Sequence, residues 1–332
     1  MILIAIETSC DESGICVIKD NRILSNLVYS QIDSHKKYGG VVPEIASREH
    51  SDKIAKLIID SNIKKADYVG FTRGPGLKGS LLIGKIAAMT ISNYFDAKLI
   101  GINHLEGHLL SVEINDDKIE KKLKFPLIAL IISGGHSELW YVENYGKYSV
   151  MGSTRDDAVG EAFDKVAKIL NLGYPGGPAI EKIASKSLRR NKIFSVPEVK
   201  DSFDYSFSGI KTQVAYYVRD NKVTLSKKKD ICYSFQDSVS KSLIKKLKLA
   251  VEKYRVNNIV VCGGVIANSY IRNMIMETFP LNKFNVFLPQ KNYSSDNAAM
   301  IGVSMLRAIE HNYEDESIEI EPDLKAGSNS EI

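Results

Sequence analysis

The sequence has few cysteines, and none of them is arranged as a pair. Its 332 residues include only four, at Cys10, Cys16, Cys232 and Cys262, with no CxxC spacing. This pattern disfavours a disulfide framework and indicates free thiols in a reducing compartment. We therefore expect a cytoplasmic protein.

Long hydrophobic runs and a strong charge bias are also missing. The longest apolar stretch covers residues 127–132, whereas a bilayer-spanning helix needs about 20 residues. The opening MILIAIE has neither the basic start nor the small-residue cleavage site of a signal peptide, and it is not Arg- and Ser-rich like a transit peptide. A net charge of +4 permits contact with a polyanion without requiring one.

One order of strands and helices occurs twice along the chain. In the first half, strands are expected at residues 2–7, 14–18, 22–29, 68–72 and 98–102, and helices from Pro43, at 80–94 and at 104–111. In the second half, strands are expected at 127–133, 137–142, 148–152, 258–261 and 285–288, and helices at 156–170, 208–219, 230–253, 267–278 and 296–310. The assignments follow from apolar residues with strand or helix periodicity.

Two copies of one mixed α/β unit explain this repeat most simply. Three strands followed by αβαβα is the ribonuclease H-like order. The sequence therefore predicts an actin-like (ASKHA) α/β fold, with helical insertions in its second half. We expect halves at 1–114 and 125–311, a linker between them and a tail at 312–332 with a poorly ordered end. The helix over 296–311 has the alternative of packing back at the cleft.

The sharpest local pattern is the segment HLEGH. Residues four apart lie about 40° apart around a helix, so His104 and His108 face the same way, as two ligands of one metal would. Glu106 lies about 200° round from His104 and points away, unlike the glutamate of an HExxH protease. The spacing equally fits two histidines in polar contacts at a helix start.

A third ligand for such a metal is available at Asp296. It opens an expected helix, with Ser294 or Ser295 as cap, and a His/His/Asp set leaves coordination positions free for an outside ligand. An acidic residue in the first turn of a helix is also ordinary dipole chemistry. The local sequence pattern therefore fits both a metal ligand and an ordinary acidic residue of a helix N-terminus at Asp296.

Glycine-rich turns are the candidate anion sites. They are SGGH at 133–136, CGGVIAN at 262–268 and YPGGP at 174–178. Bare backbone and helix N-termini can approach phosphate or ribose closely. A plain hairpin and a helix connector are the alternatives for the first and third turns.

Charged segments give weaker signals. Asp157, Glu161 and Asp164 share a helical face that either is solvated or faces a specific group. Basic residues cluster at 189–192, 227–229 and 241–253, where they could touch RNA phosphates or simply be solvated. The loop at 7–13 lacks the Gly-Thr pair and the nearby lysine of actin-like kinases, which disfavours phosphoryl transfer.

Taken together, these residues resemble the tRNA N6-adenosine threonylcarbamoyltransferase family, the TsaD-like proteins formerly described as O-sialoglycoprotein endopeptidases. The matching segments are IETSCDES, YGGVVPEIASREH, GPGLKGSLLIG, NHLEGHLLS, ISGGHSEL, DDAVGEAFDKVAKILNLGYPGGP, YSFSGIKT, CGGVIANSYIR and SDNAAM. They occur in order over nearly the whole chain. The actin-like duplication expected above agrees with the family fold.

The resemblance implies an acyltransferase. Such enzymes move a threonylcarbamoyl group from threonylcarbamoyl-AMP to N6 of the adenosine 3′ to the anticodon, in tRNAs that read codons beginning with A. It implies that His104, His108 and Asp296 hold one divalent metal, Fe²⁺ in first place and Zn²⁺ as the alternative. The substrate-binding residues that it implies are Ile132, Ser133, Gly134, Gly135, His136, Asp164, Gly177, Glu181 and Asn268. The catalytic base is open, with Asp11 and Glu12 as guesses.

Partners are implied in the same way. They are tRNA, a shorter actin-like (TsaB-like) paralogue that forms a heterodimer, and a small (TsaE-like) ATPase, while a separate synthase makes the adenylate. Residues 39–50 and the adjoining helix are the candidate pairing surface. The chain departs from the family in its acidic end, because family members commonly end in a basic, proline-rich segment. A metalloprotease and a nucleotide-gated scaffold remain as rival functions.

Overall fold

A computed structural model describes residues 1–315 and 317–325 of the chain. The chain divides into two compact units. Unit 1 comprises Met1–Phe125, Val142–Ser149 and Pro289–Ile332, and unit 2 comprises Pro126–Tyr141 and Val150–Leu288. Across the described residues, no helix is both long and apolar enough to cross a membrane. The four cysteines are all unpaired.

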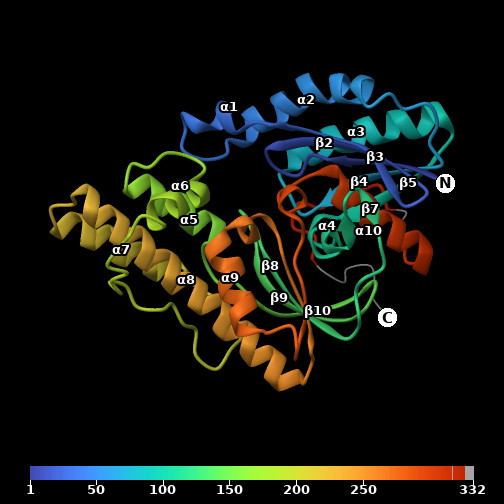
Figure 1. The fold of residues 1–332 in the computed structure, drawn as a ribbon. Helices are drawn as coiled ribbons and strands as arrows, with labels where there is room; N and C mark the ends of the chain where they lie inside the picture. Colours follow the sequence, from blue (N-terminus) through green and yellow to red (C-terminus); the bar gives the residue numbers. More distant parts are fainter. Residues whose placement is uncertain (316, 326–332) are drawn as a thin grey trace. The chain divides into compact units, whose positions relative to one another are not determined.

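Unit 1 is built on a seven-stranded sheet (Figure 1). Its strands are β1 (Ile2–Glu7), β2 (Glu12–Lys19), β3 (Arg22–Ser30), β4 (Tyr68–Gly74), β5 (Lys98–Asn103), β6 (Ile114–Asn115) and β7 (Lys118–Ile119). They lie in the order β5-β4-β1-β2-β3-β7-β6. The strands β1, β2 and β3 are antiparallel, whereas β1, β4 and β5 are parallel.

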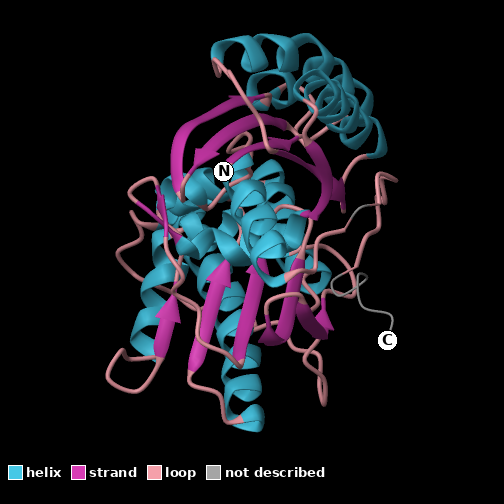
Figure 2. Ribbon diagram, turned by 90° about the vertical axis from the view of Figure 1, so that its right-hand side faces the viewer, coloured by secondary structure: helices cyan, strands magenta, loops and turns pink. Residues whose placement is uncertain are grey.

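Helices cover both faces of this sheet (Figure 2). The helices of unit 1 are α1 (Ile32–Lys36), α2 (Pro43–Asp60), α3 (Lys78–Phe95), α4 (His104–Leu110) and α10 (Ala298–His311), with short 3-10 helices η1 (Ser111–Glu113) and η3 (Lys291–Tyr293). Ile4 and Ile6 of β1 lie in a buried cluster with residues of α2 and α3. Ala5 faces the other way, toward Gly302 of α10, because successive strand residues point to opposite faces.

Unit 2 contains most of a five-stranded sheet in the order β10-β9-β8-β11-β12. Its strands are β8 (Leu127–Ile132), β9 (Ser137–Asn144), β10 (Lys147–Ser153), β11 (Asn258–Cys262) and β12 (Asn285–Phe287). Its helices are α5 (Val159–Ile169), α6 (Gly176–Ala184), α7 (Ser208–Asp220), α8 (Leu225–Tyr254) and α9 (Ser269–Thr278), with the 3-10 helix η2 (Gly264–Ala267). Strand β8 is buried at all six positions, and the helices share its apolar cluster with aromatic residues such as Phe163 and Phe235.

Helices α1 and α6 and strands β6 and β7 were not predicted from the sequence. The expected linker at 115–124 contains the short strands β6 and β7 because Ile114 and Ile119 are buried at the sheet edge. The described part of the expected tail lies against strand β4 of unit 1, where Glu321 N donates a hydrogen bond to Arg73 O. Arg73 forms ion pairs with Asp315 and Glu321, at 3.0 and 2.8 Å. The expected poorly ordered end falls on residues 326–332, outside the described residues.

The two compact units do not follow the order of the sequence, because each unit contains segments that are far apart along the chain. Helix α10 packs on β1 and β2, so Pro289–Ile332 belongs to unit 1, as in the alternative in which this helix packs back. The ranges 1–114 and 125–311 remain a prediction about the duplicated halves. The helices also start at slightly different residues from those predicted. Asn297, not Ser294 or Ser295, caps α10 by accepting a hydrogen bond from Met300 N at 3.2 Å.

Candidate functional site

The first site lies in unit 1, where helix α4 begins directly after strand β5. Asn103 starts the helix because its Oδ1 accepts hydrogen bonds from the backbone N–H of Leu105 and Glu106, at 2.9 and 3.3 Å. His104 and His108 therefore stand one turn apart on the same side of a buried helix. Their ring centroids are 4.7 Å apart.

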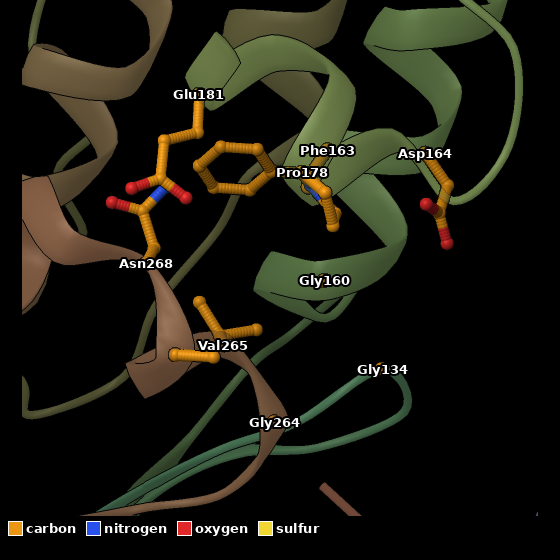
Figure 3. A pocket seen from close by; sticks show the side chains of 11 residues that line it. Gly134, Gly160, Phe163, Asp164, Pro178, Glu181, Gly264, Val265 and Asn268 are labelled. Atoms are coloured by element: carbon orange, nitrogen blue, oxygen red, sulfur yellow. The ribbon is translucent and has the colours of Figure 1, made fainter. Parts of the chain in front are cut away.

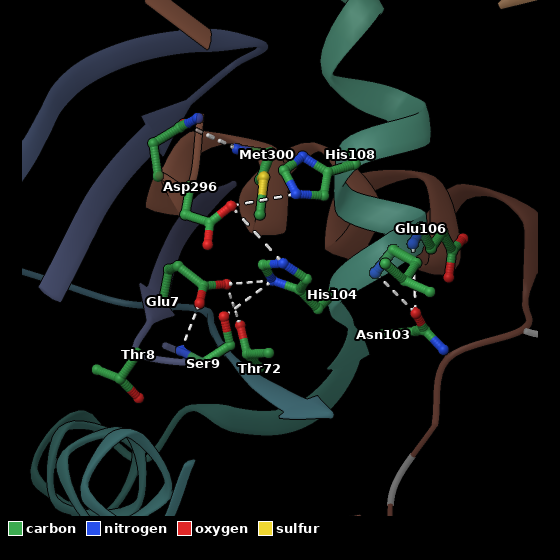
Figure 4. Close-up of polar contacts among 12 residues, drawn as sticks. Glu7, Thr8, Ser9, Thr72, Asn103, His104, Glu106, His108, Asp296 and Met300 are labelled. Atoms are coloured by element: carbon green, nitrogen blue, oxygen red, sulfur yellow. Dashed lines mark hydrogen bonds and ion pairs between the residues drawn. The ribbon is translucent and has the colours of Figure 1, made fainter. Parts of the chain in front are cut away.

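Asp296 completes a three-residue cluster with these histidines (Figure 4). Its Oδ1 lies 3.1 Å from His108 Nε2 and 3.7 Å from His104 Nε2. One ligand atom from each residue lies within 4.8 Å of the other two. The structure thus brings together the three residues that the sequence proposed as a metal site, over a separation of almost two hundred residues.

The donor set of this cluster fits a single divalent metal. Neither ring nitrogen of His108 makes a hydrogen bond among the described residues, although the ring is fully buried. His108 Nε2 lies close to the Asp296 carboxylate but is not aligned to donate to it, as expected where both atoms address a shared ion. Two imidazoles and one carboxylate suit Zn²⁺ or Fe²⁺ and leave coordination positions open.

Glu7 contacts the ring nitrogen of His104 that is opposite the one near Asp296. Glu7 was not proposed from the sequence as part of this site. Its Oε2 lies 3.1 Å from His104 Nδ1, and it accepts hydrogen bonds from Thr72 Oγ1 at 2.6 Å and Ser9 N at 2.5 Å. Burial alone would lower the pKa of His104, but Glu7 and Asp296 outweigh it and raise this pKa to about 9. Burial opposes ionisation of Glu7, yet His104 lowers the pKa of that carboxyl. A carboxylate that orients a metal-binding histidine is a recurrent arrangement.

We expect Glu7→Gln to weaken metal binding by about 10- to 100-fold while the chain still folds, because a second-sphere partner of a histidine ligand typically has this effect. Gln keeps the shape of the side chain and an acceptor oxygen for Ser9 N, but it places an amide NH2 toward Thr72 and His104 and loses the charge. Metal affinity measured by competition with a chelator checks this. Glu49→Gln is the control, because the Glu49 carboxylate accepts hydrogen bonds from Tyr29 and Ser34 and from no other side chain that the structure describes. Equal affinities of the two variants would contradict the role of Glu7.

Glu106 points away from the cluster, as the sequence predicted. It accepts hydrogen bonds from Tyr148 and Tyr313, both at 2.6 Å, through Oε1. Burial raises the pKa of its carboxyl. Held in this way, Glu106 is not placed to activate a water at the cluster, so the geometry disfavours a protease of the HExxH type.

Of the two guessed base residues, Asp11 lies in the turn after β1 and Glu12 is the first residue of β2. Asp11 is buried and Glu12 is half-buried. Burial, followed by the charges of Asp11 and Asp296, raises the pKa of Glu12 well above its ordinary value. Their role in catalysis stays a prediction.

The second site is a cavity of about 360 Å³ within unit 2 (Figure 3). Five of the nine predicted substrate residues line it: Gly134, Asp164, Gly177, Glu181 and Asn268. The remaining lining residues are Gly160, Phe163, Pro178, Gly264, Val265 and Ala267. Most of these come from the glycine-rich segments and from the helix at 156–170 recognised in the sequence, but the individual positions had not been proposed.

The other four predicted residues, Ile132, Ser133, Gly135 and His136, are not among the cavity lining. Ile132 is fully buried at the end of β8, and Ser133 closes the turn by accepting a hydrogen bond from His136 N at 3.2 Å. They shape the turn that presents Gly134. Their contact with substrate stays a prediction.

Glycines leave the cavity wall bare. An added Cβ at Gly134, Gly177 or Gly264 would meet no atom within 4 Å, so these positions present open backbone to a ligand. Gly160 differs because its Cβ would lie 2.6 Å from Ser133 O. Helix α5 therefore packs directly against the β8–β9 turn.

Polar groups of the cavity are partly used by the fold. Glu181 Oε1 accepts from Ser269 N at 2.8 Å, which leaves Oε2 without a partner among the described residues. Asn268 caps α9 and donates to Gln236 Oε1 at 2.8 Å. Asp164 Oδ1 accepts from Gly176 N at 2.6 Å.

The acidic face predicted on α5 is not a single ligand-facing surface. Asp157 forms ion pairs with Lys165 and Lys211, both at 2.6 Å, and Glu161 also pairs with Lys165. Within this set, only Asp164 lines the cavity. Asp157 does not share the face because α5 begins only at Val159, and α7 brings Lys211 to Asp157, a contact that local spacing cannot predict.

We expect Gly177→Val to block the cavity without loss of stability, since its side chain would enter open space at the second position of α6. Gly209→Val is a matched control, because Gly209 also faces open space at the second position of a helix, α7. Binding of the adenylate that the family resemblance implies, measured by calorimetry, should fall at least about 10-fold for Gly177→Val only. Equal binding by both variants would show that the cavity is not the adenylate site.

Comparisons with solved structures agree with the fold. HypF from T. kodakarensis superposes with a TM-score of 0.61 at 16% identity, covering 94% of this chain and 48% of that one. The activator of the 2-hydroxyisocaproyl-CoA dehydratase from Clostridium difficile superposes with a TM-score of 0.52 at 17% identity, covering 96% and 100%. Both have the actin-like ATPase fold, so the predicted fold class is confirmed.

Sequence comparisons identify the family. The chain is 47% identical over 314 residues to the tRNA N6-adenosine threonylcarbamoyltransferase of Endomicrobium trichonymphae, covering 91% of each chain. It is 44% identical over 340 residues to the same-named protein of Dictyoglomus turgidum, covering 98% and 99%. The family model described as TsaD, tRNA N6-adenosine threonylcarbamoyltransferase, matches residues 22–303. The chain therefore belongs to the tRNA N6-adenosine threonylcarbamoyltransferase family.

Proposed function

We propose that the chain transfers the threonylcarbamoyl group of threonylcarbamoyl-AMP to N6 of the adenosine 3′ to the anticodon, in tRNAs that read codons beginning with A. Membership of a transferase family supports this. The observation that carries it is the buried His104, His108 and Asp296 cluster, whose donors fit one open-coordinated metal.

His104, His108 and Asp296 would hold one divalent ion, Fe²⁺ or Zn²⁺. When bound, this ion supplies a Lewis acid for the phosphate of the adenylate and for the charge that develops as AMP leaves. Glu7 fixes the orientation of His104 from the opposite ring nitrogen.

The cavity of unit 2 would bind the adenylate. Its volume suits a nucleotide-sized ligand. Gly177, Glu181 and Asn268 would contact the adenosine end, and the turn from Ile132 to His136, together with Asp164, would receive the acyl end. The exposed backbone at Gly134 and Gly177, the latter at the N-terminus of α6, favours negative charge on the ligand.

The reaction balances as an acyl transfer. The N6 lone pair of the adenosine attacks the carbonyl carbon, the bond from that carbon to the phosphate oxygen breaks, and AMP leaves with the electron pair. The amine proton must pass to a base, for which we propose Asp11 or Glu12 on the basis of their position after β1. Orientation of the two reactants supplies a large part of the rate enhancement.

Partner proteins are proposed on the same basis. A shorter actin-like paralogue would pair through residues 39–50 and helix α2, beside α3, on which Leu82 and Ile86 are 44% and 52% exposed. A small ATPase would act on the resulting heterodimer. In the described part of the acidic tail, Asp315 and Glu321 form ion pairs with Arg73 of unit 1.

A reconstituted reaction tests the proposal. The chain with its paralogue and ATPase is incubated with threonylcarbamoyl-AMP and unmodified tRNA, and the nucleosides are analysed by mass spectrometry. We expect threonylcarbamoyladenosine only when adenosine stands 3′ to the anticodon, and none when guanosine replaces it. Modification of both tRNAs, or of neither, would contradict the proposal.

A further inference from the structure

Unit 2 carries a strongly basic surface at the end of α6 and the start of α8. Six side chains make it up: Lys182, Lys186, Arg189, Arg190, Lys227 and Lys229. The first four are exposed and the last two are half-buried. In the part of the chain that the structure describes, none of the six side chains has a hydrogen-bond or ion-pair partner.

The fold brings these residues together across the sequence. Ser187 Oγ donates to Asp230 Oδ1 at 2.7 Å, which holds the loop after α6 against the first turns of α8. Around α8, Lys227 lies about 60° to one side of Asp230 and Lys229 about 100° to the other, so the two lysines flank the contact between Ser187 and Asp230. The carboxylate of Asp230 is buried beneath Ser187, so it does not face the basic side chains in solvent.

The first turn of α8 carries positive side chains, which are electrostatically unfavourable at a helix N-terminus. It contains lysines and no acidic residue, although the partial positive charge of a helix N-terminus favours acidic side chains there. Lys228 is explained by its hydrogen bond to Leu170 O at 2.8 Å. Lys227 and Lys229 have no such structural role. Local rules that are broken without a structural gain are typical of functional positions.

The basic surface and the cavity share one helix. Gly177 and Glu181 of α6 line the cavity, Lys182 directly follows Glu181 in this helix, and Lys186 lies two residues past the end of the helix at Ala184. The nine residues of α6 span about 14 Å at 1.5 Å per residue. A polyanion bound to this surface therefore passes close to the cavity mouth.

We propose that this surface binds the phosphate backbone of the tRNA and so holds the target adenosine near the cavity. The inference rests on the proposed function, and it names where that substrate docks. Unpaired Arg and Lys side chains on a curved surface contact successive phosphates and release counterions. Phosphate contacts at this surface orient the tRNA and provide affinity, whereas the cavity selects the nucleotide that is modified.

Two variants and a control test the proposal on the full chain with its paralogue. Lys186→Glu/Arg189→Glu/Arg190→Glu changes three exposed residues, and Lys227→Glu/Lys229→Glu changes the helix start. Lys248→Glu/Lys253→Glu/Lys283→Glu is the control. It makes the same charge change as the triple variant, at sites that begin about 30 Å further along α8. Binding of fluorescent unmodified tRNA is measured by anisotropy at several salt concentrations.

We expect the triple variant to weaken tRNA binding at least about 10-fold and to lower the slope of log Kd against log salt by about 2. The helix-start variant should bind tRNA at least about 5-fold more weakly and yet melt about 1–3 °C higher, because glutamates suit a helix N-terminus. The control should stay within about twofold of wild type. If Lys227 and Lys229 had only a structural role, the helix-start variant would not combine a higher melting temperature with weaker tRNA binding.

The proposal is overturned if both variants bind tRNA as tightly as the control. It is also overturned if polyglutamate displaces tRNA as readily as an RNA competitor of equal charge, since the surface would then not be specific for RNA. Transfer by the wild-type chain is measured in parallel. If the wild type transfers and the variants keep their affinity, the docking surface alone fails. If the wild type does not transfer, the proposed function itself fails.

Discussion

Alanine in place of both His104 and His108 is expected to abolish metal binding and to lower the transfer rate by at least about 10³-fold. Loss of a Lewis acid removes several kcal/mol of transition-state stabilisation, and about 4 kcal/mol corresponds to this factor. Metal content after loading with Fe²⁺ or Zn²⁺ is measured by mass spectrometry, alongside transfer to tRNA.

His108→Ala alone separates loss of metal from loss of fold. The ring nitrogens of His108 make no hydrogen bonds among the described residues, so this variant leaves no donor or acceptor of the protein unpaired. His104→Ala, in contrast, removes the histidine beside the buried Glu7 carboxylate, which keeps only its hydrogen bonds from Thr72 and Ser9 among the described residues. His311→Ala, at an exposed position at the end of α10, is the control. A folded, metal-free His108→Ala protein with full activity would refute the metal-assisted mechanism.

Arg307→Met is expected to lower the free energy of unfolding by about 3–5 kcal/mol, because it leaves a buried carboxylate without its cation. Arg307 Nε lies 2.6 Å from Glu113 Oε2, and both side chains are almost completely buried. Arg307 belongs to α10, which follows Asp296, and Glu113 belongs to η1, which follows α4. This ion pair thus ties together the two chain segments that carry the metal cluster.

Chemical denaturation of the full chain measures this effect. Arg307→Met/Glu113→Gln should recover a good part of the loss, since the remaining amide still accepts from Tyr145 without an unpaired charge. Lys248→Met, which breaks an exposed pair at 3.8 Å, should change stability by less than about 0.5 kcal/mol. If Arg307→Met also lowered the free energy of unfolding by less than about 0.5 kcal/mol, the buried pair would not stabilise unit 1.

The strands could be predicted because they are buried, apolar and short. The run at 127–132 is covered on both faces and is apolar throughout, as a central strand should be. Strands β6 and β7 have only two residues each, which is too short for any periodicity. Helix α6 was hidden for a different reason. It begins with two glycines and a proline, which weaken a helical pattern, although proline is tolerated in a first turn.

The cluster of His104, His108 and Asp296 could be predicted in part from the spacing of the two histidines. Two histidines four residues apart must face the same way on a helix, and the structure agrees. Glu7 carries no comparable signal, since its contact with His104 joins positions 97 residues apart. That pairing depends on β1 and β5 flanking β4 in the sheet. Only the fold therefore reveals which buried carboxylate supports the site.

The residues predicted to bind substrate were only partly recognisable from local sequence. Glycines in turns could be recognised locally, and Gly134 and Gly177 do line the cavity. The walls at Phe163 and Val265 are ordinary apolar residues, whose position depends on how α5 and η2 pack. Sequence patterns cannot distinguish them from the core residues beside them.

The most direct test of the central claim uses an extract of cells that contain this protein. The chain is depleted, tRNA, threonine, bicarbonate and ATP are added, and threonylcarbamoyladenosine is quantified by mass spectrometry. We predict that depletion removes the modification, and that wild type restores it while the His104→Ala/His108→Ala variant does not. Undiminished modification after depletion would contradict the transferase function and favour a nucleotide-gated scaffold, and restoration by the double variant would contradict the metal-assisted mechanism.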